Sequence, residues 1–280
     1  MSSHSYVNGE YLANYLAKLS INDRSFHFAD AVYEVVAVHN NNLLFWNDHI
    51  SRLKTSLNNL NMNFKKELKV LYFISKQLIK KNNLKEGIIY IHISRGIAKR
   101  NHNWNSSLKP SIVLSCIKKN IFSLNPKKIK LISDNDIRWS KCHIKTVSLL
   151  PNVLLKQKAL NKNAFECVLK DKNAYVTEAT TSNIWFMKNK CLITTPLSSN
   201  ILAGVTRKKL IEVAKSLKIK VLEKKFKEYD LYSADSTFIT NSSSIILEAN
   251  KLNNKSLNID SSGLMKKLKL AMFEKIKNDY

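Results

Sequence analysis

Apolar residues recur at two different spacings along the first half of the chain, which predicts strands as well as helices. Asn8-Gly9 lies between two short β-prone runs and predicts a hairpin over residues 5–14. Runs typical of strands occupy residues 32–38, 43–46, 88–96 and 111–117. We therefore expect a mostly antiparallel sheet in this half of the chain.

Helical spacing predicts two helices that flank this sheet. One helix carries its apolar residues on a single face, namely Ile50, Leu53, Leu57 and Leu60. Asn47 or Asp48 would cap its first turn. A second helix is predicted over residues 65–81, so this half is of the α+β class.

The pattern breaks at residues 123–127, which we interpret as a linker between two domains, 1–122 and 128–280. The second domain alternates between the two kinds of element. Strands are predicted near residues 128–133, 165–171, 182–187, 191–195 and 236–240. Helices are predicted over residues 152–162, 205–217 and about 262–276.

Composition narrows the possible functions. The net charge of +25 would suit a nucleic-acid binder, but Lys is dispersed through all 280 residues, which favours solvated faces with incidental attraction to acidic ligands. No run approaches the roughly 18 apolar residues of a membrane helix, and the start does not resemble a signal peptide. The four cysteines are scattered, which predicts reduced thiols in a cytoplasmic protein and no metal site.

Five segments then stand out for their chemistry. They are RSFHFADAVYEV (24–35), HISRL (49–53), the triplet Arg100-Asn101-His102, HIKTVSLLPNVLLKQKA (143–159) and VTEATTSNIWF (176–186). Together they resemble the pyridoxal-phosphate transaminases of fold type IV. The triplet resembles the substrate carboxylate trap of D-amino-acid transaminases. The resemblance runs from about Tyr6 to Asn250.

This resemblance implies a two-domain fold, with a smaller N-terminal α+β domain and a larger C-terminal β-barrel-like domain with flanking helices. It implies pyridoxal 5'-phosphate as the cofactor. It also implies a homodimer in which the trap loop can come from the neighbouring subunit. Nucleic acid and membrane are not expected as partners.

Lys145 corresponds to the lysine that bonds covalently to the cofactor aldehyde, since an extended piece carries it into a helix. Glu178 corresponds to the carboxylate that pairs with the pyridine nitrogen of the cofactor. Around Glu178, the residues Thr180, Thr181, Ser182 and Asn183 either support the same pocket or form an ordinary turn.

Four residues correspond to ligands of the cofactor phosphate. Arg52 offers a planar fork of N–H donors. Val205 and Thr206 follow Gly204 at the start of the helix predicted over 205–217, where exposed N–H groups favour an anion. Ser242 offers a hydroxyl. His49 is interpreted instead as a packing or helix-start residue.

Tyr33, Arg100 and His102 correspond to the residues that hold the substrate α-carboxylate. Because they fix the carboxylate on one side, they decide which Cα hydrogen points at Lys145, and hence D or L selectivity. Ser25, Ala29 and Ala31 stand where the family often has glycine, as does the alanine after Glu178. Ser25, Ala29 and Ala31 are tolerable only if the backbone there is not left-handed.

The sequence thus predicts transamination between a D-amino acid, with D-alanine as the expected donor, and 2-oxoglutarate, which gives pyruvate and D-glutamate. Two alternatives within the fold are an L-branched-chain aminotransferase, which lacks the Arg-Asn-His triplet, and aminodeoxychorismate lyase. A basic nucleic-acid-binding protein is the alternative from a different class.

Overall fold

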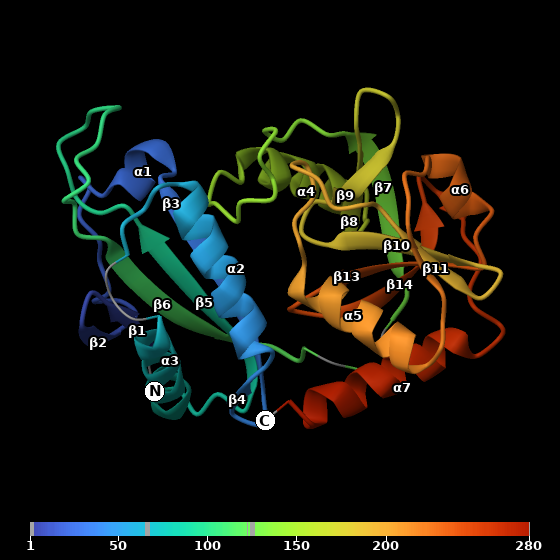
Figure 1. The fold of residues 1–280 in the computed structure, drawn as a ribbon, viewed down its shortest axis with the longest axis horizontal. Helices are drawn as coiled ribbons and strands as arrows, with labels where there is room; N and C mark the ends of the chain where they lie inside the picture. Colours follow the sequence, from blue (N-terminus) through green and yellow to red (C-terminus); the bar gives the residue numbers. More distant parts are fainter. Residues whose placement is uncertain (1–2, 65–67, 122, 124–126, 280) are drawn as a thin grey trace. The chain divides into compact units, whose positions relative to one another are not determined.

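The computed structural model describes residues 3–64, 68–121, 123 and 127–279, which form two compact units. The first unit runs to Ile121 and also takes in Ile144–Ser148, while the second comprises Phe122–His143 and Leu149–Asp279 (Figure 1). The chain therefore divides next to the predicted boundary. Residues 124–126 of the predicted linker lie outside the described residues. The return of Ile144–Ser148 to the first unit was not predicted.

The first unit contains a six-stranded sheet in the order β2-β1-β6-β5-β3-β4, and all of its pairs are antiparallel, as predicted. Its strands are β1 (His4–Val7), β2 (Glu10–Ala13), β3 (Ala31–His39), β4 (Asn42–Leu43), β5 (Glu86–Ser94) and β6 (Ser111–Lys118). Its helices are α1 (Arg24–Phe28), α2 (Trp46–Asn59) and α3 (Lys69–Lys81).

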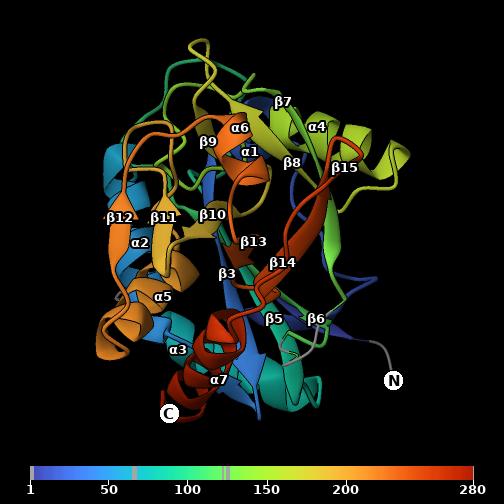
Figure 2. The same cartoon turned by 90° about the vertical axis from the view of Figure 1, so that its right-hand side faces the viewer.

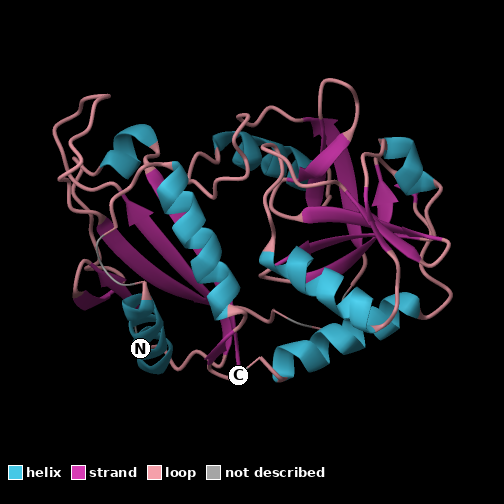
Figure 3. Ribbon diagram, in the orientation of Figure 1, coloured by secondary structure: helices cyan, strands magenta, loops and turns pink. Residues whose placement is uncertain are grey.

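One face of this sheet forms the core of the unit. Val32 and Val36 of β3 and Ile91 of β5 are fully buried there, together with Leu53 of α2 and Leu78 of α3. Alternation along each strand puts every second residue on the opposite face. The two helices and the apolar face of the sheet thus make a two-layer unit (Figure 3).

The start of α2 differs from the prediction. The strand expected over 43–46 ends at Leu43, and the helix begins at Trp46, so neither Asn47 nor Asp48 caps it. Phe45 occupies the cap position with a left-handed backbone, at φ 53°. Leu44 and Phe45 are buried, so these apolar residues serve the core and do not extend the strand.

The short helix α1 was also not predicted, and it corrects one expectation. Ala29 ends this helix with φ 52°, which is left-handed, so the statement that alanine is tolerable only without such a backbone is wrong at this position. Ser25 lies within the helix and Ala31 lies in β3, so the statement holds for these two.

The second unit contains a nine-stranded mixed sheet in the order β12-β11-β10-β13-β14-β7-β8-β9, with β15 beside β14. Its strands are β7 (Ile129–Asn135), β8 (Glu166–Lys170), β9 (Val176–Ala179), β10 (Asn183–Lys188), β11 (Cys191–Thr194), β12 (Val221–Glu223), β13 (Ser236–Asn241), β14 (Ile245–Leu252) and β15 (Lys255–Ser256). Its helices are α4 (Leu150–Asn161), α5 (Val205–Ser216), α6 (Glu228–Tyr232) and α7 (Leu264–Lys277).

This sheet is strongly twisted, so its strands point in very different directions within the unit (Figure 2). The aromatic rings of Trp185 and Phe238 stack at its centre, with centroids 5.9 Å apart. The predicted two-domain α+β fold is confirmed, although β9, β12, β14, β15 and α6 were missed. Within the described residues, no helix is long and apolar enough to span a bilayer.

Candidate active site

Lys145 lies in an extended segment that runs beside β3 in the first unit. Tyr33 N donates to Lys145 O at 3.0 Å, and Lys145 N donates to Ser56 Oγ of α2 at 3.1 Å. The lysine is therefore fixed through its own backbone to a strand and to a helix. Its Nζ lies 4.1 Å from the centroid of the Tyr33 ring. The structure thus brings together two of the residues that the sequence singled out.

A buried ion cluster lies on the core face of the same strand. Arg52 binds Glu34 through two parallel hydrogen bonds of 2.8 Å, and the His49 Nδ1 is 2.7 Å from Glu34 Oε2. Burial alone would raise the pKa of Glu34, but the charge of Arg52 and the hydrogen bonds from Arg52 and His49 outweigh it, and the pKa is lowered. Burial lowers the pKa of His49. Glu34 therefore stays ionised and fixes the orientation of the Arg52 guanidinium.

This cluster refines two interpretations. His49 is buried, as expected of a packing residue, but it also holds Glu34. Glu34 itself was missed by the sequence reasoning. The only signal for it was a charged residue between Val32 and Val36, on the face of β3 that alternation assigns to the core.

The opposite face of this sheet carries Tyr33 and a second aromatic group. The ring of Tyr90 lies 5.5 Å from that of Tyr33, and His92 pairs with Tyr33 across the two strands. Burial raises the pKa of Tyr90 to about 12 and lowers that of His92. Lys145 therefore lies against the Tyr33 ring, on a face of the sheet that also carries Tyr90 and His92.

Arg100 and His102 come together around Phe28 of α1. The Arg100 Cζ lies 5.4 Å from the centroid of Phe28, and the His102 ring lies 5.3 Å from it. Both trap side chains are exposed. Within the described part of the chain, no hydrogen bond, ion pair or ring contact joins either side chain to Tyr33 or Lys145. A single chain therefore presents the predicted carboxylate trap as two separate groups.

Glu178 lies in β9 of the second unit, and its carboxylate is buried. Arg138 Nη1 binds it, Asn183 Nδ2 donates to it at 3.1 Å, and the Leu202 N–H donates at 3.2 Å. Burial raises the pKa of Glu178 to about 7, although Arg138 opposes this shift. Arg138 opposes it only in part because it also pairs with Asp136 at 2.7 Å.

The N-terminus of α5 lies close to this carboxylate. A Cβ added to Gly204 would lie 2.1 Å from Asn183 Oδ1, so only glycine allows this approach. Val205 and Thr206 are buried at the first two helical positions. Because the first N–H groups of a helix have no partner within it, this end is suited to an anion.

Ser242 lies in the turn between β13 and β14. The neighbouring Asn241 donates to Ser182 Oγ at 2.9 Å, and Ser182 precedes the Asn183 that binds Glu178. Within this unit, hydrogen bonds and residues adjacent in sequence therefore link three places: Glu178, the start of α5 and the Ser242 turn.

The other two residues of the turn after Glu178 serve a different group. Thr180 Oγ1 donates to Glu166 Oε1 at 3.0 Å, and the Thr181 N–H donates to the same oxygen at 2.8 Å. Of the four residues after Ala179, only Ser182 and Asn183 support the Glu178 network. Arg138 was missed, since nothing in the sequence links it to a carboxylate forty positions later.

Comparisons with known proteins agree with this chemistry. The model of the family "Amino-transferase class IV" matches residues 31–252. The D-alanine aminotransferase of Staphylococcus aureus is 30% identical over 272 residues, which is 96% of each chain. The D-alanine aminotransferase of Listeria monocytogenes is 34% identical over 238 residues, which is 84% of this chain and 82% of the relative.

The fold agrees as well. The branched-chain amino acid aminotransferase of Escherichia coli superposes with a TM-score of 0.88 at 20% identity, over 99% of this chain and 95% of that one. The family match covers most of the chain, and the two D-alanine aminotransferases, at 30% and 34% identity, align over more than 80% of both this chain and their own. The chain therefore belongs to the class IV amino-transferases and is a pyridoxal-phosphate-dependent aminotransferase.

Proposed function

We propose that this enzyme transfers the amino group of a D-amino acid, D-alanine in the first instance, to 2-oxoglutarate, and so forms pyruvate and D-glutamate. The observation that carries the proposal is the pair of Arg100 and His102 on one loop, with both side chains gathered around Phe28. Relatives named D-alanine aminotransferase over nearly the full chain support it.

The donor set of the chain fits pyridoxal phosphate. When bound, this cofactor supplies an aldehyde that captures amino groups and a ring that accepts electrons. The second unit offers Glu178 for the pyridine nitrogen. It offers the N–H groups of Val205 and Thr206, with the hydroxyl of Ser242, for the phosphate. The first unit offers Arg52, which Glu34 holds in a fixed orientation.

Lys145 is the residue to which the cofactor is attached in this proposal. Its Nζ lies against the Tyr33 ring, and its backbone is held by β3 and α2, so the amine reaches a defined position. Once displaced from the cofactor by the substrate amine, the Lys145 amine would accept a proton from the substrate Cα and deliver it to the carbon that had carried the aldehyde, because a positioned amine is an effective general base and acid.

Glu178 would keep a proton on the pyridine nitrogen of the bound cofactor. The pKa of this carboxylate lies near 7 in the protein. A protonated ring nitrogen beside it would stabilise the carboxylate anion, and the anion would in turn stabilise the proton on the nitrogen. Asn183 and the Leu202 N–H both donate to Glu178 Oε2, and Arg138 binds Oε1, so the orientation of the carboxylate is fixed.

Substrate handedness follows from Tyr33, Arg100 and His102. If they hold the α-carboxylate on one side, the amino group and carboxylate of the substrate occupy fixed places. Only one enantiomer then points its Cα hydrogen at Lys145.

The separation of Arg100 and His102 from Tyr33 within one chain supports a homodimer in which the loop serves the partner's site. The four cysteines are free thiols, which supports a cytoplasmic location.

The test is a comparison of single substrates with the purified, cofactor-loaded enzyme. D-alanine, L-alanine and L-leucine are added separately, and the absorbance of the bound aldehyde is followed. We expect D-alanine alone to remove this absorbance at an appreciable rate, with pyruvate released. A faster reaction with L-leucine would contradict the proposal and favour the branched-chain alternative. A catalytic pyruvate release from aminodeoxychorismate would favour the lyase.

A further inference from the structure

The loop that carries Arg100 and His102 has no regular secondary structure, and its side chains from Lys99 to Ser107 are exposed. A short polar loop of this kind is expected to sample many conformations. A carboxylate trap requires the opposite, because its donors must be held in one geometry. Some other part of the molecule therefore has to hold this loop.

Arg24 of α1 makes this connection. Its Nη1 donates to Asn101 O at 2.6 Å and to Asn103 O at 3.3 Å, and its Nη2 donates to His102 O at 3.3 Å. Three successive carbonyl groups thus turn toward one buried guanidinium. The planar fork of arginine suits such an arrangement, whereas the single ammonium of lysine does not.

Asp30 fixes Arg24 and links it to a second arginine. Its Oδ2 accepts hydrogen bonds of 2.8 Å from Arg24 Nε and from Arg95 Nε. Charge-assisted bonds of this kind are stronger than neutral ones, and both arginines are buried. The carboxylate therefore holds two guanidinium groups in fixed relative positions.

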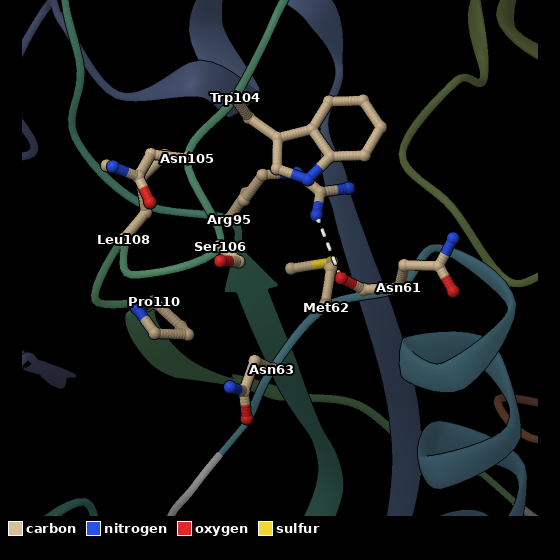
Figure 4. A pocket seen from close by; sticks show the side chains of 9 residues that line it. All are labelled: Asn61, Met62, Asn63, Arg95, Trp104, Asn105, Ser106, Leu108 and Pro110. Atoms are coloured by element: carbon tan, nitrogen blue, oxygen red, sulfur yellow. Dashed lines mark hydrogen bonds between the residues drawn. The ribbon is translucent and has the colours of Figure 1, made fainter.

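Arg95 holds the far end of the loop (Figure 4). Its Cζ lies 4.2 Å from the centroid of Trp104, and its guanidinium donates to Leu60 O at 2.8 Å and to Asn61 O at 3.2 Å. The loop is thus anchored through Arg24 at residues 101–103 and through Arg95 at Trp104.

Phe28 adds a contact to the trap side chains themselves. The guanidinium of Arg24 lies 4.7 Å from its ring centroid, and both Arg100 and His102 lie against the same ring. One five-residue helix therefore supplies the cation that holds the loop backbone and the aromatic ring that its two functional side chains contact.

We propose that Arg24 is the positioning residue of the carboxylate trap, and that it sets the preference of the enzyme for amino donors that carry an α-carboxylate. The inference rests on the proposed role of Arg100 and His102. Arg24 touches neither substrate nor cofactor in this proposal. It acts through the loop backbone.

The test compares two amino donors that differ in the carboxylate alone. Isopropylamine is D-alanine with a methyl group in place of the carboxylate. Steady-state rates with each donor are measured for the cofactor-loaded wild type and for the Arg24→Gln and Arg24→Lys variants. We expect Arg24→Gln to lower kcat/KM for D-alanine by about 100-fold, chiefly through KM, and Arg24→Lys by about 10-fold. The rate with isopropylamine changes by less than about threefold.

Two further variants complete the design. Lys76→Met is the matched control, since Lys76 donates to Asn41 O and thus holds another turn of the same unit. It should leave both donors unaffected. Phe28→Leu keeps the Arg24 hydrogen bonds and serves if Arg24→Gln does not fold. We expect it to lower kcat/KM for D-alanine by about 3- to 10-fold.

Equal losses with both donors would show that Arg24 supports the fold alone and would overturn the inference. An unchanged value for D-alanine in Arg24→Gln and Phe28→Leu would overturn it too. A different result would contradict the proposed function, namely a wild-type enzyme that prefers an L-amino acid. In that case the same variants are compared with that amino acid and isopropylamine, and the ratio still decides the role of Arg24.

Discussion

Glu34 and Glu178 are both buried carboxylates, yet their pKa values move in opposite directions. The difference lies in their cations. Glu34 receives both parallel bonds of Arg52 and a further contact from His49. Glu178 shares Arg138 with Asp136, so the attraction does not offset the cost of burial. Glu34 therefore stays an anion, whereas in the proposed function Glu178 would gain a second cation from the bound cofactor.

Glu178 makes the stability of the cofactor-free enzyme depend on pH. Its pKa is about 7 in the folded protein, against an ordinary value of 4.5 in the unfolded chain. Between these values the folded state keeps a proton that the unfolded chain has released, so the free energy of unfolding falls as pH rises. Glu178→Gln lacks this titration. We expect its stability relative to wild type to increase from pH 4.5 to pH 7 by up to about 3 kcal/mol.

Urea denaturation of the two cofactor-free proteins across this pH range measures the difference. Glu10→Gln changes an exposed carboxylate at the start of β2, and its curve should run parallel to that of the wild type. A constant difference between Glu178→Gln and wild type, or one that shrinks toward pH 7, would contradict the burial of an uncompensated carboxylate.

At the level of elements, the end of α1 is strained. Ala29 has a left-handed backbone there, which costs about 1–2 kcal/mol for a residue with a Cβ. Glycine removes this cost but loses about 0.5–1 kcal/mol through its greater freedom in the unfolded chain. We expect Ala29→Gly to raise the free energy of unfolding by up to about 1 kcal/mol, measured by urea denaturation.

Ala31→Gly is the matched control for this prediction. Ala31 is fully buried and extended in β3, so glycine offers no relief there and weakens the strand. It should lower the free energy of unfolding. If Ala29→Gly were destabilising to the same extent, the left-handed cap of α1 would not be a source of strain.

The strands of the first unit and the long helices could be predicted from their apolar period, and β3 was predicted although it contains the buried Glu34. β14 was not predicted, because Glu248, Asn250 and Lys251 leave only a short apolar run at its start. Lys128 and Lys269 bind this buried carboxylate from distant parts of the chain. The sequence around Glu248 does not indicate these distant partners.

The candidate site shows the same division. Lys145 and Glu178 were predicted because short segments around them resemble a family. Their partners were not predicted, since pairs such as Arg138 with Glu178 and Arg24 with Asn101 O form only after folding. The roles of Arg52, Thr206 and Ser242 as phosphate ligands remain predictions.

The charge of the whole molecule bears on its substrates. A net charge of +25 attracts anions. Salt limits the range of this attraction to a screening length of about 10 Å at 0.1 M ionic strength. We expect kcat/KM for 2-oxoglutarate, a dianion, to fall several-fold as ionic strength rises from about 0.02 to about 0.2 M. D-alanine carries no net charge, so its kcat/KM serves as the internal control and should change little.

Steady-state rates with each substrate varied in turn provide this measurement. Equal salt effects on the two substrates would point to a change in the protein itself. No effect on 2-oxoglutarate would mean that the positive charge is too dispersed to act on ligands.

The central claim concerns the chemistry of one amine in the whole folded enzyme. The purified protein is treated with borohydride, which makes an attachment between an amine and the cofactor aldehyde permanent, and is then digested and analysed by mass spectrometry. We expect the peptide that contains Lys145 to carry one reduced cofactor, and no other lysine peptide to do so. An unmodified Lys145 peptide from a cofactor-loaded, active enzyme would contradict the account.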